Sequence, residues 1–275
     1  MSSACMTVAL AGNPNSGKTT IFNNITGARQ HVGNYAGVTV ERREGFRRFH
    51  EKDLMLIDLP GTYSLTANSL DEVVARNVII DEKPDLIVNI LDASNLERNL
   101  YLAVQLLELE RPLVLALNMS DVAEQNGIIL KDKVLQDRFG IPVVRMVGNR
   151  NQGTDELLQA VVAASNAAVY KPFRLDYGTK IEAAITEVTT ALVSLTNVKY
   201  PMRWLAVKLL ENDSEVKTSL GKIAGGEKVL AIVESVRNKT TIIVGDELEF
   251  VISERRHRFV GELYADFVDA RAQKQ

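Results

Sequence analysis

Residues 12–19 read GNPNSGKT, which matches the phosphate-loop pattern G-x-x-x-x-G-K-T. An apolar run at residues 8–11 precedes the loop and a helical pattern at residues 19–25 follows it, which is the strand–loop–helix context that this motif requires. Gly12 and Gly17 allow the chain to wrap so that backbone N–H groups point inward at phosphate oxygens. The following helix adds its positive N-terminal end. The motif therefore predicts a binding site for nucleotide phosphates.

The loop also supplies side chains for the chemistry of phosphate transfer. We predict that Lys18 contacts the β- and γ-phosphates and that the Thr19 hydroxyl ligates Mg²⁺. The residues of this stretch that we expect to contact the nucleotide are Gly12, Asn13, Asn15, Ser16, Gly17, Lys18, Thr19 and Thr20.

The composition is that of a soluble globular protein, with 46% hydrophobic and 24% charged residues among 275. A net charge of −3 argues against a general nucleic-acid binder, so no nucleic-acid partner is expected. The single cysteine, Cys5, cannot form a disulfide framework, and with three scattered histidines it predicts no thiolate metal site. No signal-peptide pattern and no apolar run of about 18 residues is visible, so we expect a soluble, cytoplasmic chain.

Short, unbroken apolar runs alternate with helical patterns in the first part of the chain. Such runs are typical of strands buried on both faces of a parallel sheet. Residues 44–49 add a strand that pairs antiparallel with the next run through the polar turn at 50–53. We expect a six-stranded, mostly parallel α/β domain with helices on both faces. The apolar runs lie at residues 8–11, 54–57, 86–91, 113–117 and 143–147.

The pattern changes near residue 170, where helical stretches replace the strands. We therefore predict two domains, residues 1–170 and a small helical domain at 171–275. Its only tryptophan, Trp204, is expected in the helical core. The basic cluster at 255–258 is expected on a solvated helix face, with a partner or membrane-surface contact as the alternative. The predicted helices cover residues 180–195, 202–210, 228–236 and 242–270, the last of them broken.

Two motifs follow predicted strands and indicate what is bound. Asp58-Leu59-Pro60-Gly61 ends one strand, where the Asp58 carboxylate can hold Mg²⁺ through water and the Gly61 N–H can approach a γ-phosphate. Asn118-Met119-Ser120-Asp121 ends another, where the Asp121 carboxylate can accept two hydrogen bonds from guanine. Adenine lacks that pair of donors and would leave the carboxylate unsatisfied, so the motif favours guanine.

Two loops complete the predicted site. In the stretch 31–40 we select Thr39 as a second Mg²⁺ ligand and γ-phosphate contact, with Thr26 as the rival, because GTP switches place a threonine here. Residues 148–153 follow the last strand and are expected to contact the base through Gly148, Asn149 and Arg150. They lack the Ser-Ala-Lys form common in GTPases, which predicts a modest affinity for guanine.

The first 170 residues resemble small G proteins of the Ras-like fold. More particularly, GNPNSGKT, VGNYAGVTVE, DLPGTYSL, LDASNLERNLYL and NMSD resemble the N-terminal cytosolic region of the prokaryotic ferrous iron transporter FeoB family. Met119, where most GTPases have lysine, agrees with that family, and Arg203-Trp204-Leu205-Ala206 extends the resemblance into the helical domain.

The resemblance implies GTP and GDP as ligands, Mg²⁺ and K⁺ as cofactors, and slow GTP hydrolysis. It implies that the Asn15 side chain and the backbone carbonyls at Gly33 and Tyr35 hold K⁺ against the phosphates. It also implies a helical domain that restrains GDP release, a membrane domain that moves Fe²⁺ and a place on the cytoplasmic face of the inner membrane. A homo-oligomer is left open.

Catalysis is expected to depend on Lys18, Asn15, Thr39 and Gly61, which neutralise charge and position water in line with the γ-phosphate. Thr62 stands where Ras-like proteins have a water-orienting glutamine, so unassisted hydrolysis should be slow, on the order of 10⁻⁴ to 10⁻² s⁻¹. Two alternatives stay open: an Era-like RNA- or ribosome-associated GTPase, and a nucleotide-binding module without useful turnover.

Overall fold

The computed structural model describes residues 5–67, 69–166 and 170–269. The chain divides into two compact units: the first holds the described residues up to Phe173 together with those from Val260 onward, and the second holds Arg174–Phe259. The sequence predicts a second domain over residues 171–275, whereas the structure groups the described residues from Val260 onward with the first unit.

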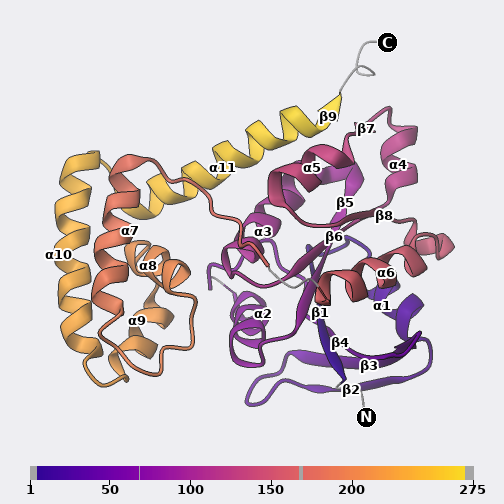
Figure 1. Ribbon diagram of the computed structural model, residues 1–275, viewed down its shortest axis with the longest axis horizontal. Helices are drawn as coiled ribbons and strands as arrows, with labels where there is room; N and C mark the ends of the chain where they lie inside the picture. Colours follow the sequence, from indigo (N-terminus) through magenta and orange to yellow (C-terminus); the bar gives the residue numbers. More distant parts are fainter. Residues whose placement is uncertain (1–4, 68, 167–169, 270–275) are drawn as a thin grey trace. The chain divides into compact units, whose positions relative to one another are not determined.

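The described part of the first unit is built on a seven-stranded sheet in the order β2-β3-β4-β1-β5-β6-β8 (Figure 1). Strand β1 lies between β4 and β5 and pairs in parallel with both, and β5, β6 and β8 continue in parallel. Strands β2–β3 and β3–β4 pair antiparallel. The strands are β1 Met6–Gly12, β2 Gln30–Asn34, β3 Glu41–Phe49, β4 Lys52–Asp58, β5 Leu86–Asp92, β6 Leu113–Asn118 and β8 Val143–Arg145.

The seventh strand is β2, in a stretch that the sequence analysis treats as a loop. Its residues QHVGN carry no apolar alternation, so no strand pattern is visible. The strand forms because β3 offers it an open edge, with Val32 opposite Arg43. The prediction of six strands was therefore one short.

Helices cover both faces of this sheet (Figure 1). Helices α1 and α6 pack on the face that carries Val8 and Leu10, while α3 packs against β5 from the other side. Helix α2 begins after Ser69, whose side chain accepts a hydrogen bond from the Glu72 N–H at 3.2 Å. The helices of this unit are α1 Lys18–Thr26, α2 Leu70–Asp81, α3 Leu96–Glu108, α4 Ser120–Gln125, α5 Asp132–Phe139 and α6 Thr154–Ser165.

A two-stranded pairing attaches the last described residues to the first unit. Strand β9, Val268–Asp269, lies antiparallel to β7, Ile129–Leu130, and the Lys131 N–H donates to the Phe267 carbonyl at 3.0 Å. β7 follows α4, so the end of the described chain pairs with a segment just beyond Asp121.

The second unit is helical. It contains α7 Thr179–Leu192, α8 Met202–Leu210, α9 Ser214–Gly221, α10 Gly226–Val244 and the first part of α11, Leu248–Phe267. The break expected in the last helix occurs at Gly245, which ends α10 in a left-handed conformation with φ 86°. Trp204 is buried in this unit, as the sequence predicts, and its ring stacks on that of Tyr200 with the centroids 5.5 Å apart.

The basic cluster at 255–258 is only partly a solvated face. Arg256 is 1% exposed and pairs with Glu211, because the helical period places it on the inward face of α11 with Ile252 and Phe259. Arg255 donates to the Asp176 carbonyl at 2.8 Å. The expectation of a wholly solvated face was therefore wrong for Arg256. Among the described residues, no helix combines the length and hydrophobicity that crossing a membrane would need.

Candidate functional site

The phosphate loop joins β1 to α1 in a shape that requires its glycines. Gly17 has φ 84°, and a Cβ there would lie 2.1 Å from Asn118 Nδ2. A Cβ on Gly12 would lie 2.6 Å from the Ile90 carbonyl oxygen. The loop is therefore pressed against β5 and β6 too closely for any side chain at these two positions.

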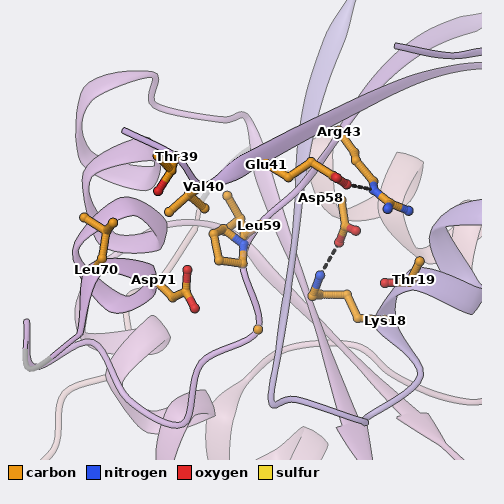
Figure 2. A pocket seen from close by; sticks show the side chains of 12 residues that line it. Lys18, Thr19, Thr39, Val40, Glu41, Arg43, Asp58, Leu59, Leu70 and Asp71 are labelled. Carbon is orange, nitrogen blue, oxygen red and sulfur yellow. Dashed lines mark hydrogen bonds and ion pairs between the residues drawn. The ribbon is translucent and has the colours of Figure 1, made fainter. Parts of the chain in front are cut away.

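Lys18 and Asp58 meet at the centre of the site. The Lys18 ammonium donates to the Asp58 carboxylate, and both side chains are buried (Figure 2). Burial raises the pKa of Asp58, although the charge and hydrogen bond of Lys18 act in the opposite direction. The pair forms because β1 and β4 are parallel neighbours, so the loop after each strand opens at the same edge of the sheet.

A cavity of about 600 Å³ surrounds this ion pair. Its lining includes Thr19, Thr39 and Gly61, so the structure brings together the predicted phosphate and Mg²⁺ contacts. In Figure 2, Thr19 lies on the Lys18 side of the cavity and Thr39 on the opposite side, near Leu70. The rival Thr26 is buried in α1, where its hydroxyl donates to the Phe22 carbonyl at 2.8 Å.

The segment after β4 is tied to the phosphate loop by backbone hydrogen bonds. The Leu59 N–H donates to the Leu10 carbonyl at 3.0 Å, and the Thr62 N–H donates to the Gly12 carbonyl at 3.2 Å. Thr62 is 5% exposed, so little of its side chain is accessible. Gly61, between these anchors, lines the cavity.

Asn118 connects the phosphate loop to the predicted base loop. Its Nδ2 donates to the Ser16 carbonyl at 2.8 Å, and its Oδ1 accepts from the Gly148 N–H at 2.9 Å. Asn24 Nδ2 in α1 donates to the Gly148 carbonyl at 2.7 Å. These contacts fix the two loops at a constant separation, as a ligand with phosphates at one end and a base at the other requires.

Asp121 and Arg150 lie together beyond this bridge. Met119, with φ 58°, turns the chain so that α4 starts at Ser120, and Asp121 occupies the first turn of that helix. Arg150 Nη2 lies 3.7 Å from Asp121 Oδ2. The three residues predicted to contact the base form a short 3₁₀ helix, Gly148–Arg150, which brings Arg150 beside Asp121.

The predicted K⁺ ligands lie in different settings. Asn15 is exposed with φ 65° at the tip of the phosphate loop. Gly33 belongs to β2, opposite Arg42. Tyr35 is buried, its carbonyl accepts from the Val38 N–H at 3.2 Å, and its hydroxyl donates to the Asp58 carbonyl at 3.5 Å. The structure gives no contact of Asn15 with either residue.

Sequence reasoning missed several residues of the site. Asn89 interrupts the apolar run of β5 and donates from Nδ2 to the Ala11 carbonyl at 3.3 Å, behind the phosphate loop. A polar residue within a buried apolar strand needs a hydrogen-bond partner, so Asn89 could have been predicted to contact a neighbouring loop. Leu70 and Asp71 also line the cavity, and no pattern marked them.

These features define a class. A phosphate loop between β1 and α1, an aspartate at the end of β4 and an Asn-x-x-Asp motif after β6 form a Ras-like G domain, here followed by a helical unit. The family model described as "Ferrous iron transport protein B" matches residues 6–161, and that of the "FeoB cytosolic helical domain" matches 177–269. The chain belongs to the FeoB family.

Known relatives agree in sequence and in structure. A ferrous iron transport protein A/FeoB fusion protein of Porphyromonas gingivalis is 40% identical over 260 residues, which is 92% of this chain and 31% of the relative. An S. thermophilus NFeoB mutant bound to GDP is 34% identical with a TM-score of 0.89, over 97% of this chain and all of that one. The cytosolic domain of T. maritima FeoB in its GMPPNP form is 33% identical with a TM-score of 0.83, over 96% and 99%.

The chain spans about a third of the length of the curated relatives that it matches.

Proposed function

We propose that this chain is the GTP-binding and GTP-hydrolysing region of a ferrous iron transporter, and that its nucleotide state controls Fe²⁺ uptake. The observation that carries the proposal is the connected site: the Lys18–Asp58 pair at one end, Asp121 at the other, and Asn118 joining their loops. Relatives whose solved structures hold GDP or GMPPNP support guanine nucleotides as the ligands.

The residues present fit a nucleotide with Mg²⁺. Within the described chain, the buried Asn13 Oδ1 and Ser16 Oγ have no hydrogen-bond partner, so the loop keeps polar atoms for a ligand. Lys18 would bind the β- and γ-phosphates, and Thr19, Thr39 and Asp58 offer oxygen ligands of the kind that Mg²⁺ takes. The bound ion would neutralise charge that develops on the phosphate oxygens.

The chain's own groups would then position the reaction. Thr39 lies across the cavity from Thr19. For Thr39 to bind the same Mg²⁺ ion, the segment 36–40 must move when GTP binds. Gly61 lines the cavity, and its N–H would orient the γ-phosphate, while Thr62 has no amide of the kind a water-orienting glutamine carries. Hydrolysis should therefore be slow without assistance, on the order of 10⁻⁴ to 10⁻² s⁻¹.

We assign the assistance to K⁺. An exposed amide oxygen on Asn15, at the tip of the phosphate loop, can hold a monovalent cation against the phosphates, with carbonyls of Gly33 and Tyr35 as further ligands. Because Gly33 lies in β2, this shell requires the end of that strand to rearrange when GTP binds.

Single-turnover GTP hydrolysis in KCl and in NaCl, with Mg²⁺ present, tests both parts of the proposal. We expect faster hydrolysis in KCl for the unaltered chain and equal rates in the two salts for Asn15→Ala, because that variant lacks the cation's side-chain ligand. Lys18→Ala, which should not hydrolyse GTP, is the background control. Equal rates in both salts for the unaltered chain would reject the K⁺ assignment. No hydrolysis in either salt would reject the proposal that the chain is a GTPase.

Membership of the FeoB family sets aside the Era-like alternative. The helical unit is proposed to restrain GDP release, and the site to lie on the cytoplasmic face of the membrane, next to the transport domain of the same polypeptide.

A further inference from the structure

The segment that follows β4 must position the γ-phosphate with its backbone alone. Thr62 is buried and short, and the Asp58–Thr62 stretch holds no amide side chain that could take the place of a water-orienting glutamine. Preorganised N–H groups act only when the chain that carries them is held still. Contacts that fix the backbone of Gly61 and Thr62 should therefore increase the rate of hydrolysis.

Arg98, in the first turn of α3, holds this segment from outside the cavity. Its guanidinium carbon lies 3.9 Å from the centroid of the Tyr63 ring, well inside the range of a cation–π contact. Tyr63 is 40% exposed and directly follows Thr62. The cation–π contact with Arg98 can therefore fix the position of the Tyr63 ring and, through it, of the backbone at Thr62.

The same residue also contacts the phosphate loop. The Arg98 carbonyl accepts a hydrogen bond from Asn13 Nδ2 at 3.3 Å. Arg98 therefore touches both parts of the site, the segment after β4 through its side chain and the phosphate loop through its backbone.

Helix α3 makes a second contact with the segment, two turns further on. Gln105, 2% exposed, accepts a hydrogen bond from the Leu65 N–H at 2.7 Å. Residues seven apart lie on one face of a helix, so Arg98 and Gln105 form a single bracing face. Because α3 is packed on β5 in the core of the sheet, this face is a rigid support for residues 63–65.

We propose that Arg98 is a positioning residue for GTP hydrolysis: by clamping Tyr63 against α3 it keeps the Gly61 and Thr62 backbone in its working place. It does not line the cavity with Lys18 and Asp58, so it acts through Tyr63 and not by touching phosphate. The inference deepens the proposed function and rests on it.

The test is a double-mutant cycle on the full chain, with single-turnover GTP hydrolysis and GDP binding measured for each variant. Arg98→Ala should slow hydrolysis about three- to thirty-fold, the range expected for losing one cation–π contact. Tyr63→Leu should slow it similarly, and the double variant no further, because both changes remove the same contact. GDP affinity should stay within about twofold, because the phosphate and base contacts remain.

Substitutions of the ring supply a second arm, whose first comparison keeps Arg98 and so does not depend on the Arg98→Ala variant folding. With Arg98 present, Tyr63→Phe, which keeps an aromatic face, should slow hydrolysis less than Tyr63→Leu. In the Arg98→Ala background the two substitutions should give equal rates. Arg47→Ala, which removes an exposed arginine of β3, is the matched control and should leave the rate unchanged.

The outcomes separate this inference from the proposed function. If the unaltered chain hydrolyses GTP and Arg98→Ala does so at the same rate, the clamp is rejected and the enzyme stands. If the effects of Arg98→Ala and Tyr63→Leu on the hydrolysis rate add in the double variant, positioning through Tyr63 is rejected. It is also rejected if the GDP affinity falls in proportion to the rate. If the unaltered chain does not hydrolyse GTP, both are overturned.

Discussion

At the scale of single residues, Gly17 shows why one position of the site must lack a side chain. Its left-handed backbone lets α1 start directly after the loop, and its lack of a Cβ leaves room for the Asn118 amide. That amide joins Ser16 to Gly148. A methyl group at Gly17 would therefore disturb the phosphate loop and the base loop together.

We expect Gly17→Ala to weaken GDP binding at least tenfold, because the new Cβ would displace Asn118. Gly140→Ala is a matched control: Gly140 also has a left-handed φ, 67°, but nothing lies within 4 Å of a Cβ there. Both variants should lose about 1 kcal/mol of unfolding free energy from the strained backbone. Titration calorimetry for GDP and chemical denaturation check the pair, and equal loss of GDP affinity in both would contradict the account.

Which residues could be predicted follows from how far apart their partners lie in the sequence. Lys18, Asp58 and Asp121 stand in short motifs whose chemistry is local, so motif spacing alone was enough to predict them as site residues. The Arg98–Tyr63 contact and the burial of Arg256 arise between segments that no motif connects. Arg150 was predicted as a base contact, but its proximity to Asp121 became visible only in the fold.

At the scale of elements, the inner strands of the sheet and the edge strand β8 were predictable, and the other edge strand, β2, was not. β1, β4, β5 and β6 are apolar runs because helices cover both of their faces. β2 depends on its partner β3 and not on its own residues. Helix α9, which no prediction covered, is short and begins after Asp213, whose side chain accepts a hydrogen bond from the Val216 N–H at 3.0 Å.

Two helices of the second unit are joined by a buried ionic cluster. Glu211, at the end of α8, pairs with Arg256 of α11 and with Lys208 at 2.9 Å. Burial alone would favour the protonated acid, but the charges and hydrogen bonds of Arg256 and Lys208 lower the pKa of Glu211 to about 2. A carboxyl with a depressed pKa stabilises the fold above its unfolded pKa, and that stability is lost as the pH falls toward 2.

Glu211→Gln should therefore destabilise the second unit by on the order of 3 kcal/mol at neutral pH. The difference from the unaltered chain should shrink between pH 4.5 and 2, where the unaltered Glu211 takes up its proton. Fluorescence of Trp204, the single tryptophan, follows denaturation of this unit. Glu234→Gln, whose pairs with Arg237 and Lys217 are half-exposed, should cost little; parallel pH profiles for all three chains would contradict the assignment.

At the scale of the whole molecule, two units share one chain. The sequence predicts a division near residue 170, because strand patterns stop there, and the structure divides the chain after Phe173. The return of the last described residues to the first unit was not, because β9 is too short to leave a pattern and pairs with a segment far away in sequence.

The second unit is proposed to slow nucleotide release. A chain ending at Phe173 should release fluorescently labelled GDP about fivefold faster or more, in the range of ordinary coupling energies. In the full chain, Glu211→Gln should act in the same direction, because it loosens the second unit without removing it. Stopped-flow displacement by excess GDP measures both, and unchanged release rates would count against the proposed restraint.

The central claim is that the phosphate loop at Lys18 and the carboxylate at Asp121 together select guanine nucleotides. Titration calorimetry of GDP against ADP on the full chain tests it most directly. The account predicts binding of GDP, no measurable binding of ADP, and at least a tenfold loss of GDP affinity in Asp121→Asn. Equal affinities for GDP and ADP, or an Asp121→Asn variant that binds GDP as the unaltered chain does, would contradict it.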